Sequence, residues 1–184
     1  MDHAKFDTII ATVDGTRGEL RLNRPDKLNP LSSHTLHEIE LAARCDLRVA
    51  AESARFSIPE VDLGIPLAWG GIPRLVREIG PALTKKLVMT CRPFDAAEAK
   101  AAGFLNRVVP DVELDSAVDE LVKQLLQKPK LALLETKAHV NAVTESMVGT
   151  GRSWADADGQ YAGLRDEEGH ASAKAYVERL QQKR

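Results

Sequence analysis

Short apolar runs alternate with polar turns over the first part of the chain, a pattern typical of strands joined by tight connections. Strands are predicted at 6–13 and 18–25, with Asp14 and a following glycine between them as a hairpin signal. Further apolar runs predict strands at 45–53, 54–61 and 105–110. This part of the chain is therefore expected to contain a mixed arrangement of strands and helices.

Helix signals interrupt these runs. A short helix is predicted to end at Gly80, and a second is predicted to start directly afterwards with Pro81 in its first turn. Asp95 and Glu98 resemble a capping box for a third helix that Gly103 ends.

The pattern changes in the last third of the chain. Amphipathic helical patterns at 114–129, at 131–143 and after Glu145 follow one another without a strand signal. We therefore predict an α/β fold with two regions, a mixed core over 1–112 and a helical region over 113–184.

Composition narrows the function classes. The chain has 43% hydrophobic and 28% charged residues, and its net charge of −2 gives no reason to expect nucleic acid or membrane partners. Cys45 and Cys91 lack the spacing of a zinc site and are most simply small core residues. With no apolar run of about 18 residues and no signal-peptide pattern, a cytoplasmic protein is the expectation.

Several motifs that suggest ligands fail on inspection. The glycine-bounded stretch 64–71 lacks the Lys-Ser/Thr pair of a phosphate loop. Aligning Gly159 with the glycine of a calcium loop places Trp154 at the first ligand position. His34 and His37 lie three residues apart but lack a third ligand, so we expect no metal site.

One acidic residue has an unusual setting. Glu60 follows Pro59 at the end of a strand-like run and precedes an apolar, glycine-rich loop that contains Gly70 and Gly71. The simpler interpretation is a loop acid that faces water. The alternative is a half-buried carboxyl group held for proton transfer.

The stretch around this acid resembles the enoyl-CoA hydratase/isomerase (crotonase) superfamily. Residues 54–75 contain an aromatic residue, the Pro-Glu pair, an aliphatic run, a Gly-Gly pair and a helix that ends in Arg-Leu. The segments 20–32, 45–56 and 83–110 resemble the early strand and coenzyme-A-contacting turn, the central strand and a helix pair of the same family.

The resemblance implies a crotonase-like spiral of ββα turns with a C-terminal helical trimerisation region. It also implies an acyl-CoA thioester as the substrate, a homotrimer or hexamer, and a role in fatty acid metabolism. Coenzyme A belongs to the substrate, so no separate cofactor is expected. Tyr176 resembles a C-terminal aromatic residue that family members place near a neighbour's adenine.

Family hydratases use two glutamates, and the resemblance assigns these catalytic roles to Glu60 and to Glu40, twenty residues earlier. Glu40 equally fits the solvated face of an ordinary helix. The expected activity is hydration of a 2-enoyl-CoA. The alternatives are an isomerase that uses Glu60 alone, or a catalytically silent protein that binds acyl-CoA or only assembles.

Substrate-binding candidates lie in two loops. Arg24, Lys27 and Leu28 follow the second predicted strand and would hold coenzyme A, although ordinary surface charges explain the two cations equally well. Trp69 and Gly70 belong to the loop after Glu60, where Trp69 is either a packing residue or part of a pocket wall.

The connection near 38–45 departs from the family pattern. A helix predicted from Ser33 leads into a strand with no turn residue between Glu38 and Asp46. Family members carry there the N–H donors for the thioester oxygen, and losing one such donor lowers the rate about 10²–10³-fold. Either a segment of the natural protein is missing here or the chain is not an enzyme, and the intact flanking motifs favour the missing segment.

Overall fold

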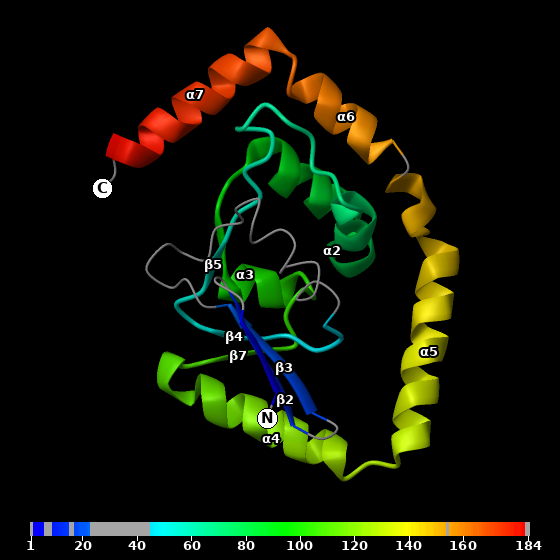
Figure 1. The fold of residues 1–184 in the computed structure, drawn as a ribbon. Coiled ribbons are helices and arrows are strands. Elements are labelled where there is room, and N and C mark those ends of the chain that lie inside the picture. Colours follow the sequence, from blue (N-terminus) through cyan, green and yellow to red (C-terminus); the bar gives the residue numbers. More distant parts are fainter. Residues whose placement is uncertain (1, 6–8, 15–16, 23–44, 154, 183–184) are drawn as a thin grey trace.

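The computed structural model describes residues 2–5, 9–14, 17–22, 45–153 and 155–182 of the chain. Short strands and the helices between residues 71 and 101 form the central body, and the helices from residue 114 onward follow its outside in an arc that ends at α7 (Figure 1).

Three antiparallel strands form the first sheet, in the order β1 (Asp2–Lys5), β2 (Ile9–Asp14) and β3 (Arg17–Leu22). The register pairs Asp14 with Arg17, so two residues separate the paired ends of β2 and β3. This confirms the predicted hairpin. The strand β1 was not predicted, because its polar sequence carries no apolar run. Its strand conformation depends on the pairing with β2.

Two further strand pairs join distant parts of the chain. The strand β4 (Val49–Ala51) runs parallel to β7 (Arg107–Val109), and β5 (Arg55–Phe56) runs antiparallel to β6 (Phe94–Asp95). The strands predicted at 45–53, 54–61 and 105–110 are therefore present but shorter than expected. The parallel pairing is reached through the intervening helices, as parallel strands require.

The helix α2 (Gly71–Thr90) contains a break at its middle. Gly80 has φ 77° and ψ 164°, a conformation that glycine adopts readily, and Pro81 begins the second half. The two predicted helices are thus confirmed as two halves of α2. The helix ends at Cys91, which has a positive φ of 49°.

The helix α3 (Ala96–Ala101) begins at a side-chain cap. The Asp95 carboxylate accepts a hydrogen bond from the Glu98 N–H at 2.8 Å. The Glu98 side chain pairs with Arg92 instead of reaching back, so only one half of the predicted capping box forms. The hydrogen bond from Arg92 lowers the pKa of the Glu98 carboxyl.

A compact apolar core lies between the two strand pairs and α3. The Phe56 ring stacks on Phe94 with centroids 5.4 Å apart and meets Phe104 edge-on at 6.1 Å. Small side chains let the strands and α3 approach closely. The buried members of this core are Ala50, Ala96, Ala99 and Leu105.

From residue 111 onward the described residues form helices only, which confirms the helical prediction. The stretch after Glu145 is divided rather than continuous, because the chain leaves the helix at Val148 and again near Leu164. The division into two domains stays a prediction. The elements are η2 (Asp111–Glu113), α4 (Leu114–Leu126), α5 (Lys130–Met147), η3 (Thr150–Ser153), α6 (Asp156–Gly163) and α7 (Glu167–Gln182).

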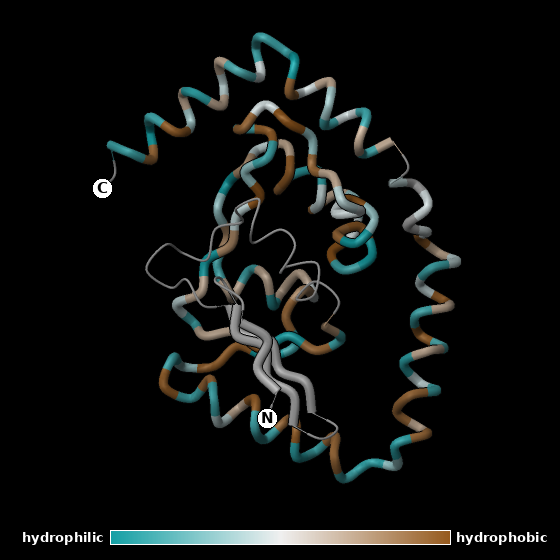
Figure 2. The backbone as a smooth tube through the Cα atoms, viewed as in Figure 1, coloured by the Kyte–Doolittle hydropathy of each residue, from teal (hydrophilic) through white to brown (hydrophobic). Residues whose placement is uncertain are grey.

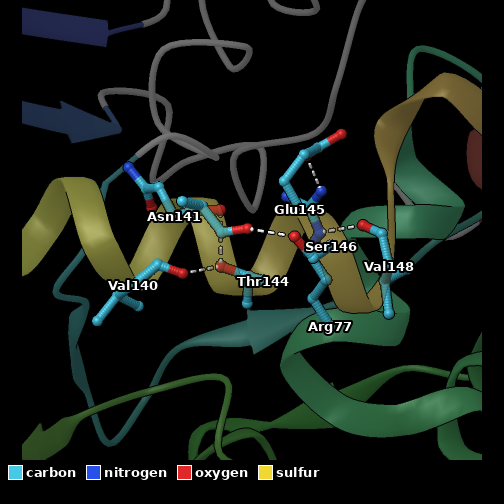
Figure 3. Close-up of polar contacts among 8 residues, drawn as sticks. Arg77, Val140, Asn141, Thr144, Glu145, Ser146 and Val148 are labelled. Carbon is cyan, nitrogen blue, oxygen red and sulfur yellow. Dashed lines mark hydrogen bonds and ion pairs between the residues drawn. The ribbon is translucent and has the colours of Figure 1, made fainter.

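Polar contacts hold the middle and the C-terminal end of α5 against the body. Near the middle of the helix, Lys137 pairs with Asp46 at 2.6 Å. At its C-terminal end, Arg77 of α2 donates to the Val148 carbonyl at 2.6 Å and pairs with Glu145 (Figure 3). A cation at this position also complements the negative end of the helix dipole.

The rest of α5 is covered little by the body. Hydrophobic positions recur along this helix (Figure 2), and none of its described side chains is buried. Val140, Val143 and Met147 lie on one face at helical spacing and are 58%, 48% and 75% exposed. These three residues, called the α5 stripe below, form an uncovered apolar face.

Candidate active site

Glu60 lies in a tight turn that follows β5. The Glu60 carbonyl accepts hydrogen bonds from the N–H groups of Leu63 and Ile65, each at 3.0 Å. Pro59 restricts the entry to the turn, and Gly64 allows its exit with φ 72°. The backbone around Glu60 is therefore held by its own hydrogen bonds, and its side chain is directed by the turn.

The Glu60 side chain is removed from water. The residue is only 5% exposed, and its Oε2 atom has no hydrogen-bond partner among the residues that the structure describes. Burial raises the pKa of the Glu60 carboxyl, and a hydrogen bond from its own backbone N–H only partly opposes this effect. Of the two interpretations made from the sequence, the structure supports the buried one.

Asp62, two residues further along the turn, is held from two directions. Its N–H donates to the Cys91 sulfur at 3.3 Å, at the end of α2. On the other side, its carbonyl accepts from the Ser172 hydroxyl at 2.9 Å and its carboxylate accepts from Arg179 at 2.8 Å, both on α7. The turn that carries Glu60 is therefore clamped between α2 and the C-terminal helix.

Three glycines allow this close contact. A Cβ atom added to Gly64 would lie 2.3 Å from the Cα of Gly169, and one added to Gly163 would lie 2.8 Å from the Gly64 oxygen. Only glycine fits such separations. The ends of α6 and α7 therefore pack directly on the backbone of the turn.

A cavity of about 240 Å³ lies beside the turn, between Asp62 and α7. Tyr176 lines it, and the pKa of this phenol is raised by burial and then by the negative charge of Asp62, with Arg179 opposing. Glu60 is not among the residues that line this cavity. Its lining residues are Asp62, Ser172, Ala175, Tyr176 and Arg179.

Trp69 and Gly70 precede α2 and both have positive φ angles, 55° and 70°. The Trp69 side chain is 50% exposed, so it is not a core residue. The Gly70 N–H donates to the Asp156 carboxylate of α6 at 2.8 Å. This hydrogen bond therefore ties the loop before α2 to the C-terminal helix α6. The substrate-binding roles of Trp69 and Gly70 stay predictions.

The remaining predicted site residues lie outside the described residues. These are Glu40, Arg24, Lys27 and Leu28, together with most of the predicted discontinuity at 38–45. The predicted pairing of Glu40 with Glu60 and the coenzyme-A-binding predictions are therefore untested.

The two cysteines differ. Cys91 is buried beneath the Glu60 turn, as predicted, and its thiol donates to the Val88 carbonyl at 3.5 Å. Cys45 is only half-buried because it lies in the bend before β4, so its prediction as a core residue was wrong. Burial raises the pKa of the Cys45 thiol, and the neighbouring Asp46 adds to this effect.

Sequence reasoning did not identify the contacts of α7 with the turn. The signal was present in the spacing, because Gly169, Ser172, Tyr176 and Arg179 recur at intervals of three or four on one face of a helix. The partner of that face lies more than a hundred residues earlier, so the sequence does not show what the face contacts.

The described part of the chain contains neither a metal-binding cluster nor a membrane-spanning helix. No group of three or more His, Cys, Asp and Glu side chains is placed there to hold a metal ion. Within the same residues, no helix combines the length and the apolar character needed to cross a membrane.

Comparison with known proteins gives consistent matches. A model of the enoyl-CoA hydratase/isomerase family matches residues 38–183. A crotonyl-CoA hydratase of Syntrophomonas wolfei is 42% identical over 102 residues, which are 55% of this chain and 39% of the relative. A probable enoyl-CoA hydratase of Mycobacterium bovis is 34% identical over 146 residues, 79% of this chain and 57% of the relative. The chain thus spans less than two thirds of either relative.

The fold has a clear counterpart among solved structures. The crystal structure of an enoyl-CoA hydratase from Mycobacterium avium subsp. paratuberculosis superposes with a TM-score of 0.76 over 95% of this chain and 98% of that one. The two sequences are 20% identical, so the match speaks for the fold alone. It confirms the predicted crotonase-like α/β fold.

Proposed function

Because the chain belongs to the enoyl-CoA hydratase/isomerase family, we propose that it adds water across the double bond of a 2-enoyl-CoA thioester, with Glu60 as a proton carrier. The observation that carries this proposal is the burial of the Glu60 carboxyl group, which is 5% exposed and has a raised pKa. Buried carboxyl groups of this kind are suited to acid–base catalysis near neutral pH.

The chemistry follows from the substrate class. A thioester spreads the charge that develops at its α-carbon onto the carbonyl oxygen, so protonation at that carbon passes through an enolate-like state. Glu60 holds its proton at a higher pH than an ordinary glutamate and delivers it to the α-carbon as water adds at the β-carbon. The dry setting of the carboxyl group keeps this proton from exchanging freely with solvent.

Other parts of the site complete the proposal. Glu40 holds or activates the attacking water, and Arg24, Lys27 and Leu28 hold the coenzyme A moiety beside Trp69 and Gly70. The thioester oxygen would be stabilised by two backbone N–H groups, which family members carry in the segment that the sequence predicts to be missing near 38–45. Coenzyme A is part of the substrate, and the chemistry requires no metal or redox cofactor.

A hydration assay tests the proposal. It follows the absorbance of the conjugated enoyl thioester, which is lost as water adds. Glu60→Gln removes the exchangeable proton at nearly constant shape, and we expect the rate to fall at least about 10²-fold. Glu113→Gln, at an exposed position in η2, is the matched control and keeps the rate. Equal rates for the natural protein and Glu60→Gln would exclude Glu60 as a catalytic residue.

The same assay separates the alternatives. Loss of rate in Glu40→Gln supports a hydratase with two carboxylates. If Glu40→Gln keeps its activity and the product is a thioester whose double bond has moved, the result supports an isomerase that uses Glu60 alone. A protein that binds acyl-CoA without turnover would be the silent member of the family. The intact mass of the natural protein shows whether residues near 38–45 are missing from the sequence.

We also propose that the protein assembles as a homotrimer, alone or paired into a hexamer. The α5 stripe, Val140, Val143 and Met147, is exposed in the single chain and forms a continuous apolar face on one helix. A second copy of the chain would remove this face from water, as symmetric assemblies commonly do.

A further inference from the structure

One face of α7 is built to contact the turn that carries Glu60. Gly169 is buried against the turn, Ser172 lies one turn further along, and Arg179 lies two turns beyond that serine. All three point to the same side of the helix because their spacing is three and seven residues. Figure 1 shows α7 near the end of the helical arc, above the segment that follows β5.

These contacts converge on a single residue of the turn. Ser172 donates to the Asp62 carbonyl at 2.9 Å, and Arg179 donates to the Asp62 carboxylate at 2.8 Å. Asp62 stands two residues after Glu60, and hydrogen bonds to the Glu60 carbonyl close the turn between them. A displacement of Asp62 would therefore be passed to the backbone that orients the Glu60 side chain.

We propose that Ser172 and Arg179, called the α7 latch below, are positioning residues that hold the Asp62 side of the turn and thereby keep the Glu60 carboxyl group dry. The latch acts through the backbone, and neither of its residues is assigned a contact with substrate. This inference rests on the proposed function only for its effect on turnover, because the burial of Glu60 can be measured without turnover.

The exposure of the ion pair argues that its main role is not stability. The side chains of Arg179 and Asp62 are 55% and 38% exposed, and ion pairs this exposed add little to the stability of a protein. What the pair does determine is geometry, because a guanidinium offers its donors in a rigid plane. If the pair only stabilises the fold, removing it leaves the pKa of Glu60 unchanged. If the pair positions the turn, removing it lowers that pKa.

Charged and titratable groups of the described residues lie around the Asp62 side of the turn. Asp62 and Arg179 form the pair itself, Tyr176 lies beside them, and Cys91 lies beneath the turn. Asp62 and Tyr176 line the same cavity, and the Asp62 N–H donates to the Cys91 sulfur, so these groups lie close together. Removing the latch is expected to act on Glu60 through water entry, because burial is the main cause of its raised pKa.

The direct test measures the titration of Glu60 by carbon-13 NMR of labelled glutamate, with the signal assigned by its absence in Glu60→Gln. We expect Ser172→Ala combined with Arg179→Gln to lower the Glu60 pKa toward its ordinary value, because water then reaches the carboxylate. Lys174→Gln, which removes a cation from the opposite face of α7, is the matched control and leaves the titration unchanged. Arg179→Lys restores a cation and shifts the titration less than Arg179→Gln.

Turnover gives a second measurement. A lower Glu60 pKa leaves less of the carboxyl group protonated at any pH above that pKa, so kcat/KM falls there and the basic limb of its pH profile moves to lower pH. The melting temperature changes little, which separates this effect from unfolding.

The outcomes are distinguishable. An unchanged Glu60 titration in the folded double variant, or in Ser172→Ala alone if the double variant does not fold, overturns the latch. A lowered titration in a protein that does not hydrate enoyl-CoA supports the latch and contradicts the proposed function. Loss of hydration in Glu60→Gln with no effect of the latch variants supports the function and contradicts the latch.

Discussion

Gly64 and Gly169, separated by more than a hundred positions in the chain, touch through their backbones. A Cβ atom on Gly64 would lie 2.3 Å from the Cα of Gly169, and one on Gly169 would lie 2.9 Å from the Gly64 oxygen. This contact places the start of α7 directly on the turn that carries Glu60. It can be tested because neither position has room for a methyl group.

Gly64→Ala is expected to lower the free energy of unfolding by about 2–4 kcal/mol, because it combines a positive φ with a backbone clash. Gly80→Ala separates the two causes, since Gly80 also has a positive φ but no atom within 4 Å of its added Cβ. We expect about 1–3 kcal/mol for that variant. Gly151→Ala has neither problem and serves as the control, with no loss expected in urea unfolding. Equal losses for Gly64→Ala and Gly80→Ala would show that the close contact adds nothing.

The raised pKa of Glu60 predicts a dependence of stability on pH. The folded protein binds the Glu60 proton more tightly than the unfolded chain does. This contribution to stability is fully present below the ordinary glutamate pKa of 4.5 and is lost as the pH rises through the raised pKa. Glu60→Gln carries no such proton. We therefore expect the unfolding free energy of Glu60→Gln to rise relative to that of the natural protein as the pH is raised from about 4 to about 8.

Urea unfolding at a series of pH values measures this difference, with Glu113→Gln as the exposed control. A constant difference between Glu60→Gln and the natural protein across the series would mean that Glu60 titrates normally when folded.

Arg77 is expected to hold the C-terminal end of α5. Arg77→Gln removes the guanidinium that donates to the Val148 carbonyl and pairs with Glu145, which should lower the unfolding free energy by about 1–2 kcal/mol (Figure 3). Hydrogen exchange should accelerate in the last two turns of α5 more than in α3. Arg74→Gln, one turn earlier on α2, is the control. Uniform acceleration across the chain would indicate general destabilisation instead of a local tether.

The α5 stripe predicts the effect of charge on assembly. Val140→Glu and Met147→Glu place carboxylates on the apolar face, so a proposed trimer should dissociate to single chains in sedimentation velocity. Leu131→Glu changes an exposed apolar residue on the opposite face of the same helix and serves as the control. A natural protein that sediments as a single chain, or a trimer that both stripe variants leave intact, would contradict this assignment.

Local sequence predicted the local features well. The break at Gly80 and Pro81 and the cap at Asp95 depend on backbone preferences of the residues themselves, and both are observed. The hairpin between β2 and β3 likewise needs only a short turn and two apolar runs. The family motif around Pro59 and Glu60 was also readable as a sequence, and it identified the candidate catalytic residue.

Tertiary structure decided what those residues can do. Nothing in the residues next to Glu60 distinguishes a solvated loop acid from a buried one, because burial depends on which distant elements cover the turn. Cys91 and Ser172 contact this turn at Asp62, from 29 and 110 positions further along the chain. The sequence by itself therefore determined where an acid stands and how its backbone turns, while only the packing of distant elements determined that its carboxyl group is dry, since desolvation is a property of the surroundings and not of the residue.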